Sequence, residues 1–141
     1  MADDDGRRLR RLVEQDVAAY NSGNVEDLHE LYVEDWKDHN QGTEGIEAQK
    51  RGIIEIRTAF PDLSLTVEDV VVEGDKVAAR VTMRGTHRSE YLGIKPTGRF
   101  VEVTAFEISN TRDGKYAETW GVLDVFSLLQ QLGVKEMPRD V

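Results

Sequence analysis

The sequence contains no cysteine, which excludes disulfide bonds, thiolate zinc sites, iron–sulfur clusters and cysteine nucleophiles. It also has no apolar run long enough for a transmembrane helix. No apolar stretch follows Arg7 and Arg8, so a secretory signal is not expected either. These absences predict a cytoplasmic protein with no membrane partner.

An excess of positive charge is also missing. The chain has 18 basic and 27 acidic residues, a formal net charge of −9. Such a surface repels nucleic acid, and the basic cluster at residues 7–11 directly follows the acidic run at residues 3–5. We therefore expect no nucleic-acid partner and favour a neutral or apolar small molecule or a protein.

Common catalytic motifs are absent as well. The chain has no Gly-x-Ser-x-Gly elbow, no glycine-rich phosphate loop and no Rossmann fingerprint. None of the three histidines, His29, His39 and His87, has a neighbour at a spacing typical of metal ligands. The sequence thus predicts no metal and no cofactor, and leaves general acid–base chemistry by carboxylates and a histidine.

The hydrophobic period changes once along the chain, from helical to alternating. A length of 141 residues predicts a single domain over residues 1–141, with residues 1–5 disordered. Helices are predicted at 6–21, at a short segment from residue 25, between Thr43 and Phe60, and at 127–132. Strands are predicted at 63–73, 77–87, 100–110 and 116–126. The pattern is that of an α+β fold, and the polar segment 34–40 is assigned to no element.

Glu107 ends an otherwise apolar row on the third predicted strand. Val101, Val103 and Ala105 share its face under strand alternation. If that row faces a pocket, desolvation would raise the pKa of Glu107 and make it a base near neutral pH. It could equally be an edge-of-sheet glutamate or an ion-pair partner of Arg80.

Several short segments follow one another in a characteristic order along the chain. They are Phe60-Pro61-Asp62-Leu63, Val67-Glu68-Asp69, Glu73-Gly74-Asp75-Lys76-Val77, Arg84-Gly85-Thr86-His87, Leu92-Gly93-Ile94, Pro96-Thr97-Gly98-Arg99, Asp113-Gly114-Lys115 and Trp120. Their order and spacing resemble the SnoaL-like polyketide cyclase family from the first helix to residue 133. The resemblance implies the cone-shaped fold of nuclear transport factor 2 and ketosteroid isomerase, with three N-terminal helices packed on a strongly bent antiparallel sheet. It also implies a deep pocket, and a homodimer or homotetramer built on the outer face of the sheet.

The activity that the resemblance implies is cofactor-free intramolecular aldol closure of a polyketide ester, in which an aspartate removes a proton beside a carbonyl. This sequence departs from that pattern. The family's catalytic aspartate falls on Gly121, and two of its histidines fall on Glu107 and Thr119. Asp124 lies three residues beyond Gly121, so alternation turns it to the opposite face, and a helix cap is its simplest role.

Glu107 and His39 are therefore the predicted catalytic residues, on a hydrophobic polyketide-like substrate. The predicted ligand-contacting residues are Tyr20, Trp36, Phe60, Met83, Tyr91, Thr119 and Trp120. Three alternatives stay open: a hydroxylase-type relative acting on polycyclic compounds, an epoxide-opening enzyme with an Asp–Arg–Asp set, and a non-catalytic domain that binds a small ligand or assembles. The substitutions at the family's catalytic positions favour the last of these.

Overall fold

The first helix carries a buried apolar stripe. The computed structural model describes residues 2–136, and α1 spans Ala2–Ser22, so it includes residues 2–5, which were expected to be disordered. Leu9, Leu12 and Val13 are at most 4% exposed, as their helical spacing predicts. The helix stops at Gly23, whose φ of +77° suits a residue without a side chain.

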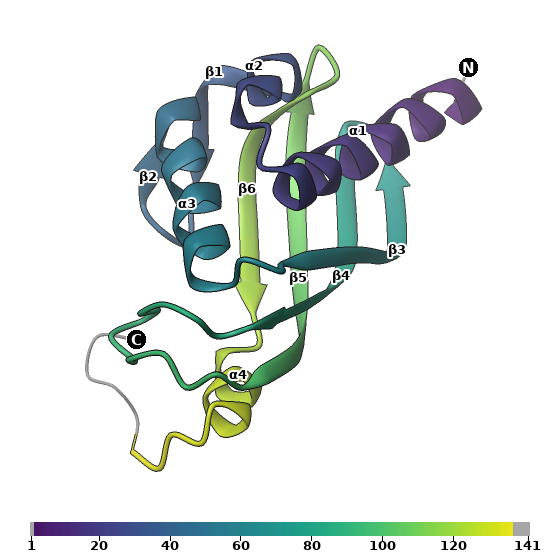
Figure 1. Cartoon of the computed structure of the whole chain (residues 1–141). Coiled ribbons are helices and arrows are strands. Elements are labelled where there is room, and N and C mark those ends of the chain that lie inside the picture. Colours follow the sequence, from purple (N-terminus) through teal and green to yellow (C-terminus); the bar gives the residue numbers. More distant parts are fainter. Residues whose placement is uncertain (1, 137–141) are drawn as a thin grey trace.

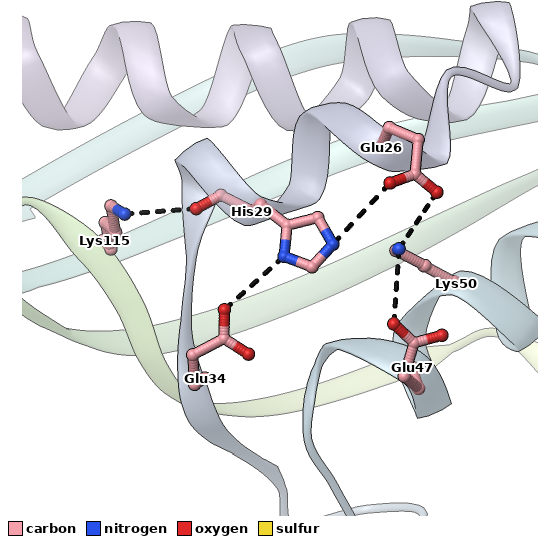
Figure 2. Close-up of polar contacts among 6 residues, drawn as sticks. All are labelled: Glu26, His29, Glu34, Glu47, Lys50 and Lys115. Carbon is pink, nitrogen blue, oxygen red and sulfur yellow. Dashed lines mark hydrogen bonds and ion pairs between the residues drawn. The ribbon is translucent and has the colours of Figure 1, made fainter.

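The following helical segments are joined to their neighbours by charged side chains. A 3-10 turn, η1 (Val25–Asp27), leads into α2 (Leu28–Leu31), and α3 spans Ile46–Ala59. Figure 2 shows Lys50 Nζ of α3 between Glu26 Oε1 of η1, at 3.0 Å, and Glu47 Oε1, at 3.3 Å. In the same view Lys115 donates a hydrogen bond to the carbonyl oxygen of His29. These contacts fix η1 and α2 between α3 and the sheet.

Six strands form one sheet within residues 2–136. They are β1 (Tyr32–Asp38), β2 (Thr43–Glu44), β3 (Ser64–Glu73), β4 (Lys76–Thr86), β5 (Phe100–Arg112) and β6 (Lys115–Leu123). Their order is β2-β1-β6-β5-β4-β3. The stretch from β3 to β6 is the predicted antiparallel meander, whereas β1 pairs with β6 in parallel. The α+β class is confirmed, and the structure adds two strands to the four that were predicted.

Strand β1 occupies the segment that the sequence assigned to no element. Tyr32, expected in the second helix, begins this strand, and Trp36 is buried within it at 2% exposure. The pairing with β6 shifts register between Tyr32 and Lys37. That irregularity breaks the alternation on which the prediction relied, and Glu34, Asp35 and Lys37 of the strand are exposed.

The helices and the core lie on one face of the sheet. Figure 1 shows α1 against the β3–β4 side and α3 beside β1, with α4 (Val125–Gln131) at the opposite end of the sheet. The outer face carries exposed apolar side chains of β5 and β6: Phe106, Ile108, Trp120 and Val122. No helix within residues 2–136 combines the length and apolar character needed to cross a membrane.

Candidate functional site

A cavity of about 240 Å³ lies between the helices and the inner face of the sheet. Its apolar wall includes Val17, Ile56, Leu65, Val81 and Met83. Its polar side chains include Asp16, Tyr20, Tyr32, Gln49 and Glu107. A few polar groups in a mostly apolar enclosure are typical of small-molecule sites.

Glu107 reaches this cavity because β5 alternates as predicted. Val101 and Val103 on the same face are buried, and the cross-strand neighbours of Glu107 are Ala79 on β4 and Gly121 on β6. Both neighbours are small, so space remains around the carboxyl group. Burial raises the pKa of Glu107 to about 8, with the charges of Asp16 and Asp38 adding to the effect.

The carboxyl group of Glu107 has no hydrogen-bond or ion-pair partner among residues 2–136. Arg80 is not its partner, because its Nε pairs with Asp69 Oδ2 at 2.7 Å on the outer face of the sheet. Glu107 is also not on a sheet edge, since β5 lies between β4 and β6. No arginine lines the cavity in the described chain, so the Asp–Arg–Asp set of the epoxide-opening alternative does not form there.

Asp16 is a second carboxyl group in the cavity and was not among the predicted site residues. It is 5% exposed on α1, and its Oδ1 accepts a hydrogen bond of 2.7 Å from the Tyr32 hydroxyl. Burial raises the pKa of Asp16 to about 7, and the bond from Tyr32 opposes this rise. Its spacing could have revealed it: Asp16 lies four residues after Leu12 and four before Tyr20, on the buried helical face.

Tyr20, one of the predicted ligand-contacting residues, borders the cavity and belongs to a polar network. Gln49 Nε2, on α3, lies 3.0 Å from the Tyr20 hydroxyl oxygen and 3.1 Å from that of Tyr32. Burial and the neighbouring Asp16 carboxyl group raise the pKa of Tyr20, so this hydroxyl keeps its proton. The network connects α1, β1 and α3 across the cavity.

Four other predicted ligand-contacting residues also line the cavity: Trp36, Met83, Tyr91 and Thr119. Trp36 Nε1 donates to Thr119 Oγ1 at 3.1 Å, and the Ser109 hydroxyl lies 2.8 Å from the same oxygen. Thr119 therefore holds the tryptophan ring as part of the wall. Phe60, by contrast, is fully buried in the core near α4 and does not border the cavity.

His39 and Trp120 lie outside the cavity. Their rings stack with centroids 4.3 Å apart, and His39 Nε2 lies 2.9 Å from Glu118 Oε2. His39 follows the last residue of β1 and lies in a turn, and its neighbours Asp38 and Asn40 line the cavity instead. The structure thus does not bring His39 to Glu107, and the carboxyl groups that share the cavity with Glu107 are those of Asp16 and Asp38.

Gly121, where the resemblance places the family's catalytic aspartate, contributes only backbone to the cavity wall. The Gly121 amide donates to Asn40 Oδ1, and a Cβ built on Gly121 would lie 3.5 Å from Glu107 Cβ. Asp124 caps α4, as expected, by accepting a hydrogen bond of 3.0 Å from the Ser127 amide. Within residues 2–136, no three acidic or histidine side chains converge as metal ligands would.

The family of the chain follows from comparison with known proteins. The family model described as SnoaL-like polyketide cyclase matches residues 10–132. TsrD from Streptomyces laurentii is similar at 35% identity and a TM-score of 0.86, over 91% of this chain and 96% of that one. IdmH from Streptomyces antibioticus, named as a candidate polyketide cyclase, is 35% identical with a TM-score of 0.78, over 89% and 99% of the two chains.

A third similar structure carries a different functional name. AclR from Streptomyces galilaeus, named as a candidate hydroxylase, is 30% identical with a TM-score of 0.77, over 91% of this chain and 97% of that one. No curated protein gives a significant match. The matched model covers most of the sequence, from the first helix to the last, and the chain belongs to the SnoaL-like polyketide cyclase family.

Proposed function

We propose that this protein catalyses cofactor-free proton abstraction beside a carbonyl group of a hydrophobic, polyketide-like small molecule, with Glu107 as the base. The observation that carries the proposal is the Glu107 carboxyl group, which borders an apolar cavity and has no partner among residues 2–136. A carboxylate consumed by an ion pair could not accept a proton so readily. One in an apolar site is a stronger base than in water.

The reaction needs one proton transfer to Glu107 and one from it. Glu107 takes the proton from the carbon beside the carbonyl group, and the C–H electron pair forms the enolate. The enolate carbon then attacks a second carbonyl group of the same molecule, which forms a C–C bond and an alkoxide. Glu107 returns its proton to that alkoxide, so no other reactant is needed and the carboxylate is restored.

A direct test is exchange of the hydrogens beside the carbonyl group of simple aryl ketones, such as 1-indanone and 1-tetralone, in deuterated water. Proton NMR should show exchange above the buffer rate with the wild-type protein. The rate should rise with pH to a plateau above about pH 8, because only ionised Glu107 accepts a proton. Glu107→Gln should return the rate to that of buffer, whereas Glu73→Gln on exposed β3 should not.

A binding protein of the same fold is the rival interpretation, and the same experiment separates the two. It is supported by Gly121 and Thr119, which stand where the resemblance places catalytic residues. If the aryl ketones bind but the wild-type protein exchanges none of their hydrogens at any pH, the catalytic proposal is contradicted. A ligand-binding role then becomes the better reading.

We also propose that a second copy of this chain covers the outer face of the sheet. Ile108 lies directly opposite Trp120, and Phe106 opposite Val122, so four apolar side chains, each 42–60% exposed, form one patch. Side chains of both charges border the patch, including the ion pair of Arg80 with Asp69. A surface that carries both charges around an apolar centre can complement itself about a two-fold axis.

A further inference from the structure

Tyr20 offers a hydroxyl proton that no residue between 2 and 136 accepts. Its oxygen receives the hydrogen bond from Gln49 Nε2, and no other hydrogen bond of this hydroxyl is present. A phenol can accept and donate at once, so the donor side of Tyr20 is unused. Tyr20 is only partly buried and borders the cavity, so a ligand atom can reach it.

The orientation of Gln49 is settled by its other neighbour. Tyr32 gives its only hydroxyl proton to Asp16, at 2.7 Å. The Gln49 atom that faces Tyr32 must therefore be a donor, which is the NH₂ group, and the same nitrogen faces Tyr20. Because Gln49 donates to Tyr20, the Tyr20 proton cannot point back at Gln49. The hydrogen bonds that link Asp16, Tyr32 and Gln49 therefore occupy one side of the Tyr20 hydroxyl, and its proton can point only into the cavity.

We propose that the Tyr20 hydroxyl donates a hydrogen bond to a carbonyl oxygen of the ligand, and that Asp16, Tyr32 and Gln49 hold it in that orientation. The inference rests on the proposed function and adds the group that binds the oxygen. When Glu107 removes the proton beside the carbonyl group, negative charge moves from the carboxylate to that oxygen. A fixed hydroxyl donor stabilises the charge where it develops. Tyr20 acts as a donor and not as a base, because it remains protonated.

The chemistry of this cavity therefore selects ketones over hydrocarbons of the same shape. The apolar wall contacts the rings, and Tyr20 recognises the oxygen. Tyr91 is the natural comparison, because it is also a tyrosine of the cavity wall, whereas the hydrogen bonds of Gln49 in the described chain go to Tyr20 and Tyr32. If any tyrosine in the wall could serve, Tyr20 and Tyr91 would be equivalent.

Calorimetric titration with 1-indanone and with indane, which lacks the oxygen, tests the proposal. The wild-type protein should bind 1-indanone more tightly than indane. Tyr20→Phe should weaken 1-indanone binding about tenfold, the factor for one lost hydrogen bond, and leave indane unchanged. Tyr91→Phe should leave this preference intact. Three results would overturn the proposal. They are an equal preference for 1-indanone over indane in wild type and Tyr20→Phe, loss of that preference in Tyr91→Phe instead, and no binding of either compound.

Infrared spectroscopy of the bound ketone gives a readout that a merely structural role would not move. The carbonyl stretch of 1-indanone should shift to lower frequency in the wild-type protein and return toward its value in apolar solvent in Tyr20→Phe. Gln49→Leu should weaken the binding of 1-indanone more than that of indane. Equal loss of affinity for both compounds would refute the positioning role of Gln49. Glu107→Gln should keep the shifted carbonyl stretch while losing hydrogen exchange, so failure of the base and failure of the donor are told apart.

Discussion

Replacing Glu107 by glutamine should change how the stability of the protein depends on pH. Burial raises the pKa of this carboxyl group from 4.5 to about 8, which corresponds to about 5 kcal/mol of unfavourable free energy once the group is ionised. Between these two values the folded chain keeps a proton that the unfolded chain has released. Raising the pH in that window therefore favours unfolding. Below pH 4.5 both states are protonated and the penalty vanishes.

The measurement is urea unfolding followed by tryptophan fluorescence at several pH values from 4.5 to 9. The stability of wild type relative to Glu107→Gln should fall by about 1.4 kcal/mol per pH unit up to about pH 8, and then level off. The difference between the two proteins removes the titration of every group whose pKa the substitution leaves unchanged, so what remains comes from Glu107 and from Asp16, whose charge interacts with it. Glu73→Gln, at an exposed position of β3, should give a flat difference. A flat difference for Glu107→Gln as well would refute the argument that this carboxyl group is desolvated.

Three further substitutions test other parts of the structure. Tyr116→Phe should raise the free energy of unfolding by about 1 kcal/mol in thermal or urea denaturation, because it removes a buried hydroxyl with no partner in the described chain. Thr119→Val should lower it by about 2 kcal/mol, since Trp36 Nε1 then loses its acceptor. Ile108→Lys should convert a dimer into a monomer in sedimentation velocity, whereas Ile54→Lys, the same change on exposed α3, should not. A chain that is monomeric before mutation would contradict the proposed dimer.

The sequence was informative wherever side chains kept a strict period. The alternation from Val101 to Glu107 grouped Glu107 with an apolar row, and in the structure that row lies on the inner face of the sheet. The same rule placed Trp120 on the opposite face from Thr119. In the structure Trp120 stacks on His39 outside the cavity, which agrees with that placement. Its inclusion among ligand-contacting residues came from its aromatic character rather than from its position.

Sequence reasoning failed where tertiary contacts decide the outcome. Strand β1 was missed because its irregular pairing with β6 hides the alternation and because only two of its side chains, Tyr32 and Trp36, are buried. Asp16 was missed because an acidic residue in an amphipathic helix is usually exposed. Its burial depends on Tyr32, which comes from another element, and single-sequence patterns do not report such pairs.

The pairing of Glu107 with Gly121 has a consequence for how this cavity can vary. Side chains directly opposed on antiparallel strands originate about 5 Å apart, so a carboxyl group carried by either strand reaches nearly the same volume. Gly121 holds the place that the resemblance gives to the family's aspartate, and its lack of a side chain leaves that volume to the longer Glu107. An acid can therefore migrate from one strand to its neighbour by two substitutions. The walls, the helices and the mouth of the cavity would stay as they are.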